Sequence, residues 1–153
     1  MNEFASTSIF LPKEFQPYLR MYCSTHTEGT HSNPKDSPFP RMVDMWFMAV
    51  CIAVKEELKP NFDTRKETYK PIEGVVFGSD GWRSNALMLL AISYTGNVEV
   101  TRNPREMMRI ANAYALAGLP RLINILEEDR KGDTALDHLS EVIGDMIGHP
   151  QKL

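Results

Sequence analysis

The chain has 153 residues, 42% of them hydrophobic and 24% charged, so it is long enough for one globular domain with a buried core. Its formal net charge of −3 argues against direct nucleic-acid binding, since contact with many phosphates usually requires a basic face. The N-terminus lacks the basic and apolar regions of a signal peptide, and no apolar run approaches the roughly 20 residues of a membrane span. We therefore expect a cytoplasmic protein without a membrane segment.

The first part of the chain reads as an arm. Residues 12–22 predict a short helix that opens at Pro12 and that Pro17 would interrupt if it were longer. The stretch 23–38 is rich in Ser, Thr, Asn, Gly and Pro, which is typical of a loop. We therefore predict an N-terminal arm and polar loop over 1–38, a helical domain over 39–148 and a tail over 149–153.

The helical domain begins with a long helix predicted over 40–58. Pro40 suits its first turn, Pro60 is expected to stop it, and its apolar residues recur at helical spacing. Cys51 lies in this apolar run and is expected to be a buried thiol. After a polar connection, the apolar run 72–77 favours a strand, although Gly74 weakens that reading.

The next helix is predicted over 82–94 and is apolar on most faces, so we expect it to be the central one. Ser79 or Asp80 is placed to cap its start, and Gly96 to close it in the left-handed conformation. The strongest local signal for a helix start is the stretch 103–106. Asn103 can cap the helix, Pro104 suits its first turn, and Glu106 is placed to reach back to the cap amide.

Two breaks are predicted in the remaining chain. Pro120 should end the helix that Asn103 opens, because proline has no amide to donate and crowds the preceding turn. A further helix is then expected as far as Gly132, and a last one from a cap at Asp133 or Thr134 as far as Gly148. The fold class predicted is mainly α: a compact single-domain bundle of roughly five or six helices with at most one or two short strands.

No reactive site can be read from the sequence. Cys23, His26 and His31 lie close together, but they lack the paired spacing of a zinc site, so we predict no metal. The loop 78–81 precedes a helix but lacks the lysine of a phosphate-binding loop, so we predict no cofactor. No Ser or Cys has the glycine context of a nucleophile elbow, and we expect a non-enzyme. A cryptic enzyme would need acidic and histidine side chains that converge only in space.

The methionines and tryptophans suggest a contact surface. Methionine fills irregular gaps in cores and also serves adaptable interfaces. Aromatic and methionine side chains concentrate at the cores of interfaces. The candidate partner-binding residues are Met42, Met45, Trp46 and Trp82. They would contact other proteins or a second copy of the chain.

The alternative interpretation is a small DNA-binding regulator. The stretch 102–109 would place Arg102, Arg105 and Arg109 against phosphates from the first turn of a helix.

Several motifs between residues 39 and 128 resemble a known family. They are Phe39, Trp46-Phe47-Met48-Ala49-Val50-Cys51, Asn85-Ala86-Leu87-Met88-Leu89-Leu90-Ala91, Thr95-Gly96-Asn97, Ile110-Ala111-Asn112-Ala113-Tyr114-Ala115 and Gly118-Leu119. In this order they look like small bacterial proteins encoded beside the genes for DNA phosphorothioation (Dnd). The resemblance implies a non-enzymatic accessory subunit of a DNA-modification or anti-phage defence complex, with protein partners and no catalytic residues to carry over.

Overall fold

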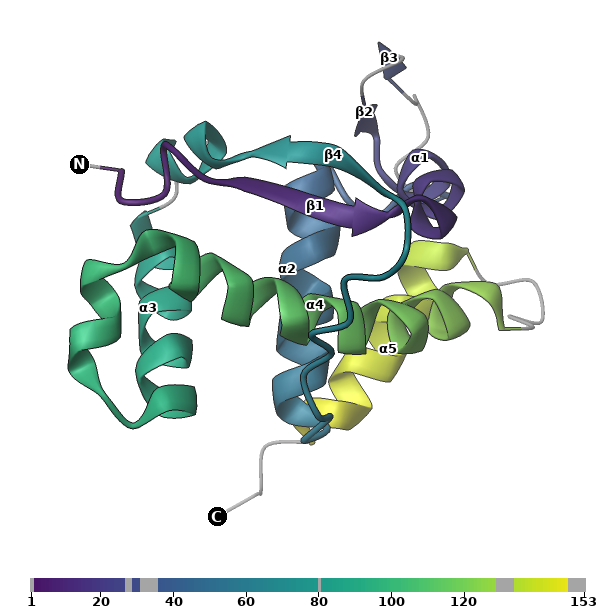
Figure 1. The fold of residues 1–153 in the computed structure, drawn as a ribbon. Helices are drawn as coiled ribbons and strands as arrows, with labels where there is room; N and C mark the ends of the chain where they lie inside the picture. Colours follow the sequence, from purple (N-terminus) through teal and green to yellow (C-terminus); the bar gives the residue numbers. More distant parts are fainter. Residues whose placement is uncertain (1, 27–28, 31–35, 80, 129–133, 149–153) are drawn as a thin grey trace.

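The computed structural model describes residues 2–26, 29–30, 36–79, 81–128 and 134–148 (Figure 1). In chain order its elements are β1 (Ser8–Pro12), η1 (Lys13–Phe15), α1 (Gln16–Tyr22), β2 (Thr25–His26), β3 (Gly29–Thr30), α2 (Met42–Lys55), β4 (Thr68–Glu73), η2 (Gly74–Ser79), α3 (Gly81–Thr95), η3 (Val98–Arg102), α4 (Pro104–Glu127) and α5 (Ala135–Ile147), where η marks a 3-10 helix. The predicted mainly α fold is confirmed. None of the helices in these residues is both long and apolar enough to cross a bilayer.

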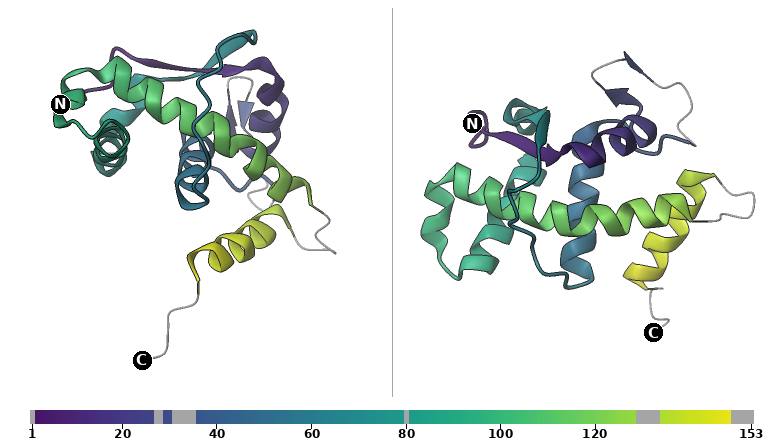
Figure 2. Two further views of the ribbon diagram at one scale, coloured as in Figure 1. Left: turned by 60° about the horizontal axis from the view of Figure 1, so that its bottom comes forward. Right: turned by 45° about the vertical axis from the view of Figure 1, so that its right-hand side comes forward.

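The centre of the molecule is the crossing of α2 and α4, with α2 behind α4 in Figure 1. Twelve residues of α4 are buried, whereas α3 buries only Arg83, Ser84, Leu87 and Ala91. The prediction that residues 82–94 form the central helix is therefore wrong. That helix is apolar on several faces, but only one of them meets the rest of the fold. In every view α2 lies between α3 and α5 (Figures 1 and 2).

The N-terminal segment belongs to the same core. Strand β1 pairs with β4 in an antiparallel ladder, with Ser8 opposite Glu73 and a bulge between Ile9 and Leu11. Phe4, Ile9 and Leu11 are fully buried against the helices. The residues predicted as a separate arm thus supply core side chains. Their signal was the alternation of residues 8–11, in which Ile9 and Leu11 share one face of a strand.

The second strand differs from its predicted position. It runs over Thr68–Glu73, and residues 74–79 form the 3-10 helix η2 instead of continuing the strand. Gly74 ends it because the backbone of the N-terminal segment lies directly against its Cα. A Cβ at Gly74 would lie 1.8 Å from the Phe4 carbonyl oxygen.

Several of the predicted helix ends are observed. Gly96 has a φ of +68° after α3, and the Asn103 side chain accepts a hydrogen bond from the Glu106 amide at 3.1 Å. Thr134 caps α5 by accepting from the Asp137 amide, while Asp80 and Asp133 lie outside the described residues. The Glu106 carboxylate pairs with Arg109 at 2.7 Å.

Two prolines that were predicted to end helices do not do so. Pro120 does not end a helix, because α4 continues through it to Glu127. Leu119 and Leu122 on either side are fully buried, and that packing outweighs the single lost hydrogen bond. Pro60 was also expected to stop the first long helix, but α2 already ends at Lys55. Two residues later Glu57 adopts a positive φ of 55°.

The polar loop after α1 is tied to the body at both ends. Phe39 returns to Cys23 in a parallel bridge, and the Ser24 amide donates to the Phe39 carbonyl at 2.7 Å. The Ser37 hydroxyl donates to the Met21 carbonyl at 2.8 Å. Between them, β2 and β3 pair in antiparallel orientation.

Candidate functional site

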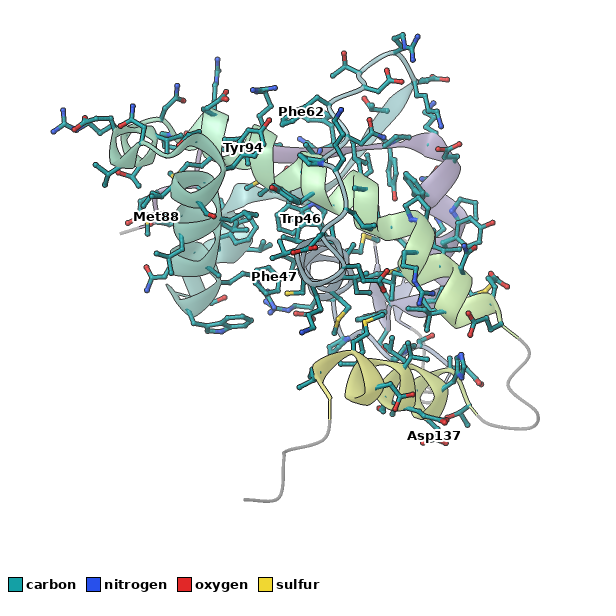
Figure 3. The ribbon with its side chains drawn as sticks, turned by 90° about the horizontal axis from the view of Figure 1, so that it is seen from below. Trp46, Phe47, Phe62, Met88, Tyr94 and Asp137 are labelled. Atoms are coloured by element: carbon teal, nitrogen blue, oxygen red, sulfur yellow. The ribbon has the colours of Figure 1, made fainter. Side chains whose placement is uncertain are left out.

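An apolar channel runs along the side of α2 that faces away from α4. One hollow of about 470 Å³ lies between α2 and α3, and a second of about 280 Å³ lies between α2 and α5. Cys51 and Lys55 line both hollows, so the two are neighbours on the same side of α2; we refer to them together as the apolar channel, with α2 as its floor. Figure 3, seen from below, shows α3 and α5 on two sides of α2.

The channel walls expose large hydrophobic side chains. Leu89 of α3 is 67% exposed, Val54 of α2 is 47% exposed and Ile147 of α5 is 73% exposed. Among the described residues that line either hollow, Lys55 is the only charged one. Contiguous exposed apolar surface often marks a site of contact with another protein.

A rigid aromatic cluster adjoins the channel at the start of α3. The Trp82 and Phe47 rings meet edge to face at 5.4 Å, and Phe47 also lines the hollow between α2 and α3. The Arg83 guanidinium lies 4.7 Å from the Trp82 ring centre and donates to the Asp44 carboxylate at 2.8 Å. Asp44 in turn accepts from the Arg41 amide and caps α2. Trp82, 59% exposed, is therefore a surface aromatic held in one orientation.

Three of the four predicted partner-binding residues are not at the surface. Met42, Met45 and Trp46 are buried in the core, and only Trp82 is exposed. Trp46 donates its indole N–H to the Asn112 side chain of α4 at 2.9 Å. The correction has a simple cause: α2 has two apolar faces, and sequence spacing does not show which one α4 covers.

The outward face of α2 carries its own helical pattern. Phe47, Cys51 and Val54 stand at positions i, i+4 and i+7, which place them on one side of a helix. Trp46 and Phe47 accordingly lie on different sides of α2 in Figure 3. This second stripe was the sequence signal for the channel, and the larger Met and Trp residues of the first stripe obscured it.

The three predicted phosphate-contacting arginines do not act as one array. Arg102 pairs with Glu99 at 3.1 Å and has an 83% exposed side chain. Arg109 pairs with Glu106, which lowers the pKa of that carboxyl through the hydrogen bond, and its guanidinium lies 4.6 Å from the Phe62 ring centre. Arg105 and Arg109 line a groove beside β1, and Arg102 does not.

The two cysteines occupy opposite environments. Cys23 is buried, where loss of solvation raises the pKa of its thiol to about 12. Cys51 was predicted to be buried but is exposed on the channel floor, because it belongs to the outward face of α2. Its apolar neighbours also raise its pKa through desolvation.

Thiol labelling should therefore distinguish the two residues. At pH 8 the native protein is expected to react with Ellman's reagent at Cys51 only, more slowly than a free thiol, because only the thiolate attacks. Cys23 should react once the chain is unfolded in guanidinium. Cys51→Ser should abolish the native reaction. Labelling of Cys23 in that folded variant would contradict the burial of its thiol.

No metal-binding cluster assembles in the part of the chain that the structure describes: no three His, Cys, Asp or Glu side chains gather closely enough. Of Cys23, His26 and His31, which we weighed as metal ligands and rejected, His31 lies outside those residues. Two acidic side chains on the helices have partners: Glu56 forms an ion pair with Arg121 at 3.1 Å, and Glu128 is hydrogen-bonded to the His138 ring at 2.9 Å.

The fold and the channel together define a small α-dominated protein whose distinctive surface is apolar. Residues 27–144 match the family model for DNA sulphur modification system-associated protein 4, and the chain belongs to this family. The resemblance predicted from residues 39–128 is confirmed, and the match extends beyond it at both ends. No curated protein and no solved structure matches the chain significantly.

Proposed function

We propose that this protein is a non-enzymatic accessory or assembly subunit of a bacterial DNA-modification or anti-phage defence complex. It acts by docking the apolar channel of α2, α3 and α5 onto another protein of that system. The family assignment supports the association with a DNA sulphur modification system. The single observation that supports docking is the exposed apolar channel itself.

The channel has the features of an interface core. Its walls supply apolar area, and Trp82 supplies a preorganised aromatic anchor of the kind that dominates binding energy. Lys55 is the one charged residue of the floor in the described part of the chain, so an acidic side chain on the partner would complement it. An apolar helix face or a second copy of the chain could occupy such a groove.

The test is co-expression with the other proteins of the host's DNA sulphur modification system. We expect the wild-type chain to co-purify with one of them, and Leu89→Glu or Val54→Glu to abolish that association, because each would bury an unpaired charge in the interface. Val75→Glu is the matched control, since Val75 is 60% exposed and lies in η2 outside the channel.

Two results would overturn the proposal. One is a wild-type chain that remains monomeric by light scattering and co-purifies with none of these proteins. The other is an equal loss of association in Val75→Glu. Circular dichroism of each variant verifies that it is folded, and an association of the chain with itself would assign the channel to a homo-oligomer.

A further inference from the structure

A second groove, of about 410 Å³, lies on a different part of the surface, between β1 and the first half of α4. None of the residues that line it lines the apolar channel. Figure 1 shows the backbone of β1 running past α4, the two elements that supply most of its lining. Its polar and charged lining comes from Ser6, Thr7, Ser8, Arg105, Arg109 and Asn112.

The walls of this groove are held in place by the core. The Asn112 side-chain amide donates to the Phe10 carbonyl of β1 at 2.8 Å, and its oxygen accepts from the Trp46 indole at 2.9 Å. The opposite edge of β1 pairs with β4. The Thr7 hydroxyl donates to the Phe4 carbonyl at 2.7 Å. The groove therefore needs little rearrangement to accept a ligand.

The charge in the groove is positive and only partly compensated. Two hydrogen bonds from Arg109 to Glu106, at 2.7 and 2.9 Å, fix the orientation of one guanidinium. Arg105 is exposed and has no ion pair with any other described residue. Glu73, opposite Ser8 in the ladder, pairs with Lys70 at 3.3 Å.

We propose that this groove binds a phosphate group, presented by a free phosphate-bearing molecule or by a nucleic-acid backbone. The Arg105 guanidinium offers the planar fork of donors that matches two phosphate oxygens. Ser6 and Ser8 add hydroxyl donors on the opposite wall. Arg105 lies in the first turn of α4, where the helix dipole also favours an anion. A site that uses only two arginine side chains is compatible with a chain whose net charge is negative.

The first arm of the test uses inorganic phosphate and an isotopically labelled chain. Titration should give saturable shifts of the backbone amide signals of residues 6–10 and 105–112. Arg105→Ala should weaken binding about tenfold, because it removes charge-assisted hydrogen bonds. Arg102→Ala is the matched control, because it removes the same charge three residues away from a side chain that does not line the groove.

The second arm identifies the source of the phosphate. A short fluorescent DNA duplex is titrated by anisotropy over a range of salt concentrations. If the groove holds the backbone, inorganic phosphate competes, and Arg105→Ala lowers the slope of log affinity against log salt by about one. If phosphate binds and the duplex does not, the ligand is a free phosphate-bearing molecule. Absence of saturable binding in both arms overturns the proposal, and so does an equal loss in Arg102→Ala. These outcomes are independent of the co-purification test of the apolar channel.

Discussion

Replacing Trp46 with alanine is expected to lower the free energy of unfolding by about 4 kcal/mol, in the range of large aromatic truncations in cores. Trp46 is fully buried at the α2–α4 crossing, and its ring meets the Phe77 ring edge to face at 6.0 Å. The substitution leaves a cavity and removes the indole donor from Asn112, which also loses its link to the core. Urea denaturation followed by circular dichroism measures the change as a shift of the midpoint.

The chain carries its own control for this experiment. Trp82→Ala removes the same side chain from a position that is 59% exposed, so we expect a loss below about 1 kcal/mol. Trp46→Phe keeps an aromatic ring in the core but removes the indole N–H and part of the buried ring volume, so its loss should be smaller than that of Trp46→Ala. Comparable losses in Trp46→Ala and Trp82→Ala would mean that Trp46 does not occupy the core.

Gly118→Ala is expected to destabilise the protein by about 3 kcal/mol, although alanine is the better helix former by about 1 kcal/mol. Gly118 lies where α4 crosses α2, and an added Cβ would stand 1.9 Å from the Ala49 carbonyl oxygen. That neighbour is backbone, which cannot rotate away as a side chain can, so the two helices must move apart. Thermal and urea unfolding of the purified variant report the loss.

Gly144→Ala is the matched substitution in another helix. Gly144 lies within α5, and a Cβ there would meet no atom within 4 Å. The variant should therefore gain about 0.5–1 kcal/mol from helix propensity alone. The two substitutions thus have opposite signs. A neutral or stabilising Gly118→Ala would show that α4 does not approach α2 at this position.

Trp46→Ala and Gly118→Ala both test the crossing of α2 and α4, the first from α2 and the second from α4. That crossing positions both the apolar channel and the phosphate groove. Trp46 and Gly118 set how α4 lies across α2, which leaves the opposite face of α2 open as the channel floor. Asn112, bonded to Trp46, holds β1 beside α4 and so forms the phosphate groove. Trp46→Ala should therefore weaken phosphate binding as well as stability, whereas Leu89→Glu should affect neither.

Local chemistry in the sequence was sufficient to predict the ends of several helices. Asn103 and Thr134 cap their helices through side-chain oxygens, and Gly96 adopts the left-handed conformation, as their residue types predict. Each of these features depends on a side chain and a backbone group a few residues away. Such contacts depend on the local sequence and not on the packing of distant segments.

Features that depend on distant segments could not be predicted in this way. The sequence alone determined that a long helix with apolar faces lies within residues 40–58, that the chain is mainly helical, and which family it resembles. Only the tertiary structure decided that α4 runs through Pro120, that β1 joins the core, and that Trp46 faces inward while Phe47 and Val54 face the channel. The physical reason is that local propensities differ by about 1 kcal/mol or less, whereas burying one large side chain contributes about 2–3 kcal/mol. Packing between segments far apart in the chain therefore chooses which of several apolar faces is buried and which is left for a partner.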